Sequence, residues 1–132
     1  MILGIGQDLV DIPRIAEVHR RYGARFLQRI FTPVEQAKAA SRAAPAPTLA
    51  KRFAAKEAMA KALGTGMAQG VAWRQIGVVN KPGGQPEIEL QGAALARLHA
   101  LTPRGLKPRV HLTLTDEGPQ AQALVIITAD PH

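Results

Sequence analysis

The sequence predicts an α+β fold, in which several helices accompany a mainly antiparallel sheet within one domain, residues 1–132. Helix-type segments with capping signals fill most of the first half, whereas alternating and apolar strand-type segments fill much of the second. Strands and helices do not alternate regularly, which argues against a parallel sheet. The last two strand-type segments are separated by a short turn, so we expect an antiparallel hairpin.

The chain begins with a strand, predicted over residues 2–10 from its apolar and β-branched composition. Two glycines interrupt this strand and indicate that another backbone approaches it closely. A helix is expected from residue 11 to about 21, with Asp11 or Ile12 near its N-cap and Pro13 in its first turn. A second short helix is predicted over residues 24–31.

A third helix is predicted from Thr32 to about residue 43. Thr32 is a favourable N-cap, a proline follows it, and Glu35 stands where a capping box needs it. The Ala/Pro segment 44–47 interrupts the helical pattern. The longest helix is then predicted over residues 48–63, and the glycines that follow would end it.

The second half carries strand-type segments separated by turn residues and one helical stretch. In order, we predict a strand over 71–80, a turn-rich connector over 81–86, a half-exposed strand over 87–90, a helix over 91–101, and strands over 110–115 and 121–128.

Composition limits the possible functions. The net charge is +7, which favours anionic partners such as phosphorylated ligands, nucleic acid, anionic membranes or acidic proteins. Aromatic residues make up only 4% of the chain, which is little for stacking on single-stranded nucleic acid. There are no cysteines, no membrane-length apolar run and no signal-peptide pattern at the N-terminus. We therefore expect a cytoplasmic protein that does not span a membrane, and the low aromatic content argues against nucleic acid as its partner.

The long alanine-rich helix carries charged side chains at Arg52, Lys56, Glu57 and Lys61. Asp8 lies near the end of the first strand. Two carboxylates from separate elements, with bases nearby, suit a Mg²⁺ ion that also binds phosphate oxygens. Spacing alone, however, favours an ordinary surface ion pair between Glu57 and Lys61.

The other candidate residues also have ordinary structural interpretations when each is considered alone. The glycines after the long helix can simply end it, the histidine and threonines of the 110–115 strand can be surface residues, and the basic residues of the first two helices can be a solvated face. These candidates are Gly64, Thr65, Gly66, His111, Thr113, Arg14, Arg20, Arg21 and Arg25.

Taken together, four blocks of the sequence resemble the holo-[acyl-carrier-protein] synthase family, the bacterial 4′-phosphopantetheinyl transferases. The blocks are 4–12 followed by Arg14-Ile15, the charged helix and its turn at 52–66, Gly84-Gln85-Pro86, and 111–116. The resemblance spans nearly the whole chain and implies the phosphopantetheinyl transferase fold, usually as a homotrimer whose sites are shared between neighbouring subunits.

The resemblance implies a reaction in which the 4′-phosphopantetheine arm of coenzyme A is transferred to a serine of apo acyl carrier protein. The other product is adenosine 3′,5′-bisphosphate, and the product carrier serves fatty acid biosynthesis. Asp8 and Glu57 would be the Mg²⁺ ligands, and Lys61 would complete the catalytic group near the diphosphate. The residues implied to hold coenzyme A are Arg52, Lys56, Gly64, Thr65, Gly66, Pro86, His111 and Thr113. The acidic carrier would dock on Arg14, Arg20, Arg21 and Arg25.

The sequence departs from the family pattern at three places. Gln7 stands where the family usually has threonine, and Asp116 ends a segment that often ends in histidine. The Ala/Pro-rich segment 43–47 replaces a stretch in which a basic ligand-contacting residue often occurs, so Arg42 or Lys51 would have to take that role.

Two other classes of function remain as alternatives. A small nucleic-acid-binding module would use the net positive charge and would be indifferent to the two carboxylates. A non-catalytic adaptor for acidic proteins would use only the basic helix that begins near Arg14.

Overall fold

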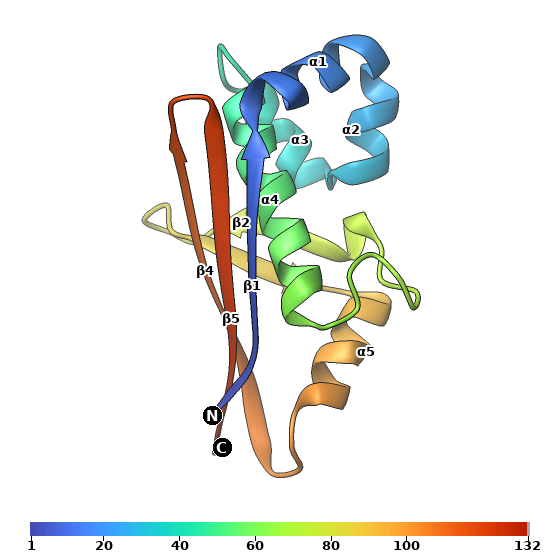
Figure 1. The fold of residues 1–132 in the computed structure, drawn as a ribbon, viewed down its shortest axis with the longest axis vertical. Helices are drawn as coiled ribbons and strands as arrows, with labels where there is room; N and C mark the ends of the chain where they lie inside the picture. Colours follow the sequence, from blue (N-terminus) through green and yellow to red (C-terminus); the bar gives the residue numbers. More distant parts are fainter. Residues whose placement is uncertain (132) are drawn as a thin grey trace.

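The computed structural model describes residues 1–131 (Figure 1). Its elements, in chain order, are β1 (Ile2–Asp11), α1 (Ile12–Tyr22), α2 (Ala24–Ile30), α3 (Pro33–Ala40), α4 (Ala46–Ala62), the 3₁₀ turn η1 (Trp73–Gln75), β2 (Ile76–Asn80), β3 (Pro86–Leu90), α5 (Gly92–Leu101), β4 (Leu106–Glu117) and β5 (Gln120–Pro131). Within these residues, no helix has the length and apolarity that a membrane crossing requires.

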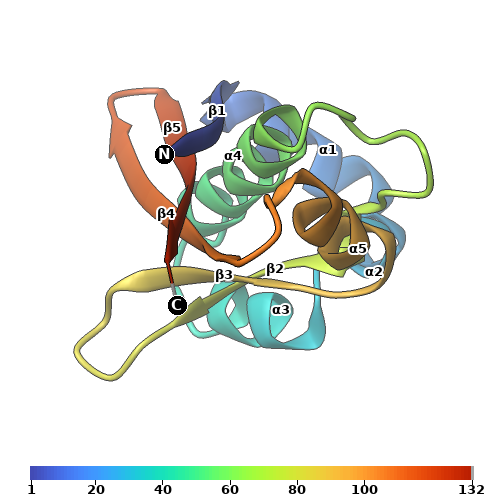
Figure 2. The same cartoon turned by 90° about the horizontal axis from the view of Figure 1, so that it is seen from below.

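The strands form two separate antiparallel sheets. A three-stranded sheet has the order β1-β5-β4, and a separate two-stranded sheet pairs β2 with β3. The helix α4 lies along the inner face of the three-stranded sheet, between it and the remaining helices, and no helix of residues 1–131 covers the outer face of that sheet (Figure 2). The α+β class and the mainly antiparallel sheet are therefore confirmed.

The two glycines of β1 allow the strand to lie against the backbone of α4. A side chain at Gly4 would clash with the carbonyl of Ala62, and one at Gly6 would clash with the carbonyl of Ala58. The close approach expected from the sequence is thus confirmed. It holds Asp8, the next inward-facing residue of β1, beside α4.

The core around α4 consists largely of small side chains. The alanines at positions 54, 55, 58 and 60 are fully buried, together with larger neighbours such as Leu49 and Met59. Nearly the whole circumference of α4 is therefore covered. This burial agrees with its sequence, in which polar and apolar residues do not separate onto two faces.

Both predicted N-caps are present. The Asp11 carboxylate accepts a hydrogen bond from the backbone N–H of Arg14 at 3.2 Å. Thr32 and Glu35 form the expected capping box, with the Thr32 N–H donating to Glu35 Oε1 at 2.8 Å.

Several element boundaries differ from the prediction. A strand over 71–75 is wrong, because residues 73–75 form η1 and the strand begins only at Ile76. The third helix ends at Ala40 rather than about 43, and the long helix begins at Ala46 and ends at Ala62. The last two strands extend well beyond the predicted ranges, because their pairing continues from the turn to Pro131.

Candidate functional site

Asp8, Glu57 and Lys61 lie together where β1 meets the side of α4. The Lys61 ammonium donates to Asp8 Oδ1 at 3.0 Å and to the Gln7 carbonyl at 3.0 Å. Asp8 and Glu57 both line a cavity of about 370 Å³ that Arg14 of α1 also borders. Two elements far apart in the sequence thus bring the three predicted catalytic residues to one place.

The electrostatics of Glu57 reflect this arrangement. Partial burial raises the pKa of Glu57 above its usual value, the nearby Asp8 carboxylate raises it further, and the Lys61 ammonium opposes both effects. Two carboxylates held close enough to repel each other form a place where added positive charge is favourable.

This donor set fits a magnesium ion. Magnesium is commonly held by one or two carboxylates and completes its shell with substrate phosphates and water. Among residues 1–131, no group of three or more His, Cys, Asp or Glu side chains is placed to hold a metal, so a site closed by protein ligands alone is not formed. Asp11 borders the same cavity, but its carboxylate caps α1.

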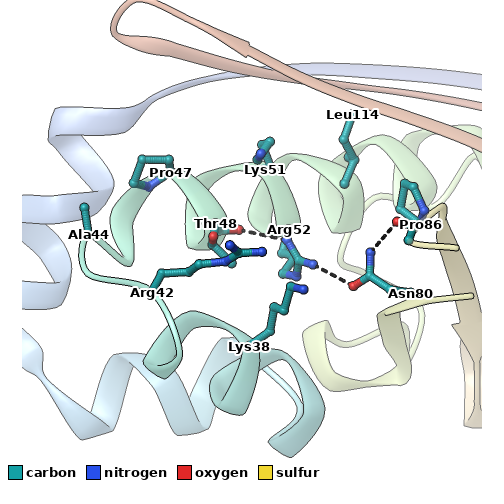
Figure 3. Close-up of a pocket in the computed structure, with 11 residues that line it drawn as sticks. Lys38, Arg42, Ala44, Pro47, Thr48, Lys51, Arg52, Asn80, Pro86 and Leu114 are labelled. Atoms are coloured by element: carbon teal, nitrogen blue, oxygen red, sulfur yellow. Dashed lines mark hydrogen bonds between the residues drawn. The ribbon is translucent and has the colours of Figure 1, made fainter. Parts of the chain in front are cut away.

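A second, larger cavity of about 610 Å³ is strongly basic (Figure 3). It lies between α3, α4 and the β2–β3 hairpin, and the charged ends of Lys38, Arg42 and Arg52 point toward one another in it. Lys51 and the predicted ligand residue Pro86 also line this cavity. Lys51 is paired with Asp116, but Lys38, Arg42 and Arg52 form no ion pair within residues 1–131. Such a group of cations suits an anion such as phosphate.

Arg52 is the buried member of this cluster. Its guanidinium donates to Asn80 Oδ1 at 3.2 Å and to the Thr48 carbonyl at 3.5 Å, while Nε has no hydrogen-bond partner in the described part of the chain. Burial lowers the pKa of Arg52, Glu35 opposes that effect, and Arg42 lowers the pKa further. An anion in the cavity would relieve the repulsion between Arg42 and Arg52.

The Lys56 side chain does not point toward Asp8 and Glu57. Its side chain is fully buried on the opposite side of α4, where the ammonium forms an ion pair of 2.8 Å with the equally buried Glu35. The family resemblance implied that Lys56 lies on the ligand side of the helix, but Lys56 lines neither cavity.

The turn at Gly64, Thr65 and Gly66 follows α4 directly. Both glycines have positive φ angles, 81° and 58°, which explains why glycine occupies these positions. Arg97 of α5 donates to the Leu63 carbonyl at 2.9 Å and so holds the end of α4 next to the turn.

His111 and Thr113 lie on the outer face of the three-stranded sheet. Their β5 partners in the strand register are Ile126 and Leu124, and His111 contacts Thr128 Oγ1 through Nε2 at 2.9 Å. These two predicted ligand residues therefore face away from the cavities on the inner side.

The basic residues of α1 and α2 are exposed, as predicted. Arg20 forms an ion pair with Glu17 on its own helix, which reduces its availability to a partner, whereas Arg21 and Arg25 form no ion pair within residues 1–131. Beside them lies a groove of about 520 Å³ lined by aromatic and basic side chains, namely Tyr22, Arg25, Phe26, Arg29 and Trp73.

Sequence reasoning missed Lys38, Asn80 and Glu35, and it named Arg42 only as a substitute. Lys38 and Arg42 are four residues apart and both fell within the helix predicted to about residue 43, so a shared face was detectable, although Arg42 lies just beyond the end of α3. The approach of the β2–β3 hairpin, which brings Asn80 to Arg52, has no local sequence signal.

The chain is similar to known proteins over nearly its whole length. The model of the 4′-phosphopantetheinyl transferase superfamily matches residues 4–115. A holo-[acyl-carrier-protein] synthase of Azorhizobium caulinodans is 62% identical over 130 residues, which cover 98% of this chain and 96% of the relative.

Solved structures give the same result. A holo-[acyl-carrier-protein] synthase from Neisseria meningitidis is 40% identical, covers 97% of this chain and 99% of its own, and superposes with a TM-score of 0.83. One from Bacillus anthracis, solved in complex with CoA (3′,5′-ADP), is 30% identical, covers 96% of each chain, and has a TM-score of 0.77.

Proposed function

The chain belongs to the 4′-phosphopantetheinyl transferase superfamily and, within it, to the holo-[acyl-carrier-protein] synthases, and on this premise we propose its reaction and its site. The enzyme transfers 4′-phosphopantetheine from coenzyme A to a serine of apo acyl carrier protein, depends on Mg²⁺, and releases adenosine 3′,5′-bisphosphate. The product carrier serves fatty acid biosynthesis. The observation that carries the proposal is the meeting of Asp8, Glu57 and Lys61 beside one cavity.

Asp8 and Glu57 would hold the magnesium ion, and Lys61 would approach the coenzyme A diphosphate. When bound, the ion supplies charge stabilisation for the departing bisphosphate. The serine oxygen forms a bond to the phosphorus that carries the pantetheine arm, the bond from that phosphorus to the bridging oxygen breaks, and the serine proton passes to water or to a site carboxylate. Lys61 would support the same charge development from beside the ion, because its ammonium is paired with Asp8, one of the two proposed ligands.

The basic cavity would bind the phosphorylated nucleotide end of coenzyme A. Arg52, with its unpartnered Nε, and the neighbouring Arg42 and Lys38 supply donors for a phosphate. Arg42 and Lys51 would thereby supply the basic ligand contact that the Ala/Pro-rich segment 43–47 lacks. Lys51 is also paired with Asp116 at 3.1 Å, so this aspartate orients a cation of the cavity. Pro86 and the 64–66 turn would contact other parts of the ligand.

The acidic carrier would dock on the exposed basic residues of α1 and α2. Arg14 borders the carboxylate cavity itself, and Arg21 and Arg25 lie further along the same surface. Attraction between opposite charges would speed association and fix the orientation of the acceptor serine, and it would weaken as salt concentration rises.

A homotrimer with shared sites would explain why some predicted ligand residues lie far from both cavities within one chain. His111 and Thr113 lie on the outer face of the three-stranded sheet, where Ile5 and Leu9 of β1 are more than half exposed, at 59% and 57%. Apolar side chains on a sheet face without a covering layer favour contact with another copy. Such contact would bring His111 and Thr113 to a neighbouring site. The proposal also keeps the cytoplasmic location expected from the cysteine-free sequence.

A direct test is to incubate the purified protein with coenzyme A, Mg²⁺ and an apo acyl carrier protein and then to measure the intact mass of the carrier. We expect the carrier to gain one phosphopantetheine group, and we expect no gain when the acceptor serine of the carrier is replaced by alanine. Excess chelator should also prevent the gain. An unmodified carrier in the complete reaction would reject the proposed function and would favour the adaptor or nucleic-acid alternatives.

A further inference from the structure

A buried ion pair joins α3 and α4 on the side of α4 that faces away from the catalytic residues. Glu35 and Lys56 both have side chains with 0% exposure, and Glu35 Oε1 lies 2.8 Å from Lys56 Nζ. The Lys56 ammonium also donates to the carbonyls of Trp73 at 3.1 Å and Ile76 at 2.5 Å. All three of its N–H donors therefore have an acceptor.

Glu35 extends the same network to the second sheet. One carboxylate oxygen accepts from the backbone N–H of Thr32 at 2.8 Å, and the other accepts from the backbone N–H of Val78 at 2.7 Å. The pair thus fixes one side of α4 to the start of α3, to η1 and to β2.

The position of Lys56 in the sequence links this network to the site. Consecutive residues of a helix lie about 100° apart around its axis, so the direction of Lys56 sets the direction of Glu57. On the other side of α4, the glycines of β1 fix how closely the strand that carries Asp8 approaches. The Glu35–Lys56 pair and this contact together hold α4 from two sides.

Stability alone does not account for an ion pair at this place. Removing two charges from water is costly, and apolar replacements of buried pairs are often as stable or more stable. The surroundings of α4 give a different reason. Its buried contacts are largely alanine methyl groups, which interdigitate little and so define the rotation of a helix poorly. The directional hydrogen bonds from Lys56 to its three acceptors do define the rotation of α4 about its axis.

Resting on the proposed function, we propose that the Glu35–Lys56 pair is a positioning element of the transferase. It sets the rotation of α4 about its axis and so directs Glu57 toward Asp8. Neither residue contacts the ligands in this role.

The test compares Lys56→Met with the double variant Glu35→Gln/Lys56→Met. In the single variant a buried carboxylate loses its partner, whereas the double variant contains neither charge. We expect the double variant to melt at a higher temperature than the single variant. Its kcat and its affinity for Mn²⁺, measured by the EPR signal of free Mn²⁺, should nevertheless stay about 10- to 100-fold below the wild-type values, as for other residues that orient metal ligands. The KM for coenzyme A should change little.

The matched control is Met59→Ala, which removes a fully buried side chain of α4 that makes no directional bond. It should melt earlier than the wild-type protein but keep its Mn²⁺ affinity and its kcat below the melting temperature. If the double variant does not fold, Glu35→Gln alone decides the question, because it keeps the volume of the side chain. Wild-type kcat and Mn²⁺ affinity in the folded variant would overturn the positioning role. An inactive wild-type enzyme would instead overturn the proposed function.

Discussion

The two long sides of α4 carry the same kinds of charged side chain in opposite environments. On one side Glu35 and Lys56 are completely buried, and every polar atom of the pair has a partner. On the other side Lys61 is half exposed, and Asp8 and Glu57 border an open cavity. Each side has one ion pair between a carboxylate and an ammonium, at 2.8 Å for Glu35–Lys56 and at 3.0 Å for Asp8–Lys61.

The difference between the two sides indicates their roles. The buried pair is closed to ligands, so its charges can act only on the protein itself. The open side leaves two carboxylates with one ammonium, an imbalance that a bound cation would correct. Residue type and spacing along the helix therefore do not distinguish a closed structural pair from a group that is open to ligands, whereas burial and the number of satisfied partners do.

The first prediction tests the open side. Asp8→Ala and Glu57→Ala should each reduce kcat for carrier modification by about 10³-fold or more, because each removes a proposed ligand of the ion that stabilises the leaving group. Far-UV circular dichroism should show that both variants stay folded. Glu89→Ala, which removes an exposed carboxylate of β3, is the control and should keep full activity. Near-normal turnover in either site variant would reject that residue as a metal ligand.

The second prediction contrasts the two lysines of the helix. Lys56→Ala should lower the free energy of unfolding by about 3 to 5 kcal/mol, because it leaves the Glu35 carboxylate buried without its partner. Lys61→Ala should lower it by less than about 1 kcal/mol, because the pair with Asp8 is reached by solvent. Urea unfolding of both variants measures the contrast. Equal losses would show that burial does not separate the two sides of α4.

Much of the fold was predictable because its signals are local. The caps at Asp11 and Thr32 and the close approach at the β1 glycines all follow from a few neighbouring residues, and each is present. The strand predicted over 71–75 was wrong because a short apolar segment does not distinguish a strand from a 3₁₀ turn.

The site was only partly predictable, for a different physical reason. Asp8, Glu57 and Lys61 were identified together; in the structure Asp8 and Glu57 line one cavity, and Lys61 is paired with Asp8. The direction of Lys56 was not accessible from the sequence, because an alanine-rich helix buried on nearly all sides has no polar face to reveal its orientation. The partner of Lys61 was also missed, since it comes from β1 and not from the same helix.

The smallest predicted effect concerns Glu57 and the pH. Its pKa is raised in the folded protein, so folding favours the protonated form. The corresponding stability is fully present below the pKa of an unfolded glutamate, about 4.3, and is lost as the pH rises through the higher folded value. Above that window the metal-free wild-type protein holds an ionised Glu57 close to Asp8, whereas Glu57→Gln places a neutral amide there.

In the absence of metal, Glu57→Gln should therefore melt about 1 to 3 °C above the wild-type protein at neutral pH, a modest gain because solvent reaches the site and screens the repulsion. The gain should shrink as the pH falls toward 4, where Glu57 becomes neutral in both states. Adding Mg²⁺ should raise the melting temperature of the wild-type protein more than that of the variant, since the ion binds only the folded site. Scanning calorimetry across pH, with Glu89→Gln as the control, measures both effects. A difference that is constant with pH would mean that Asp8 and Glu57 do not repel each other, and the open side of α4 would then lack the charge imbalance that sets it apart from the buried one.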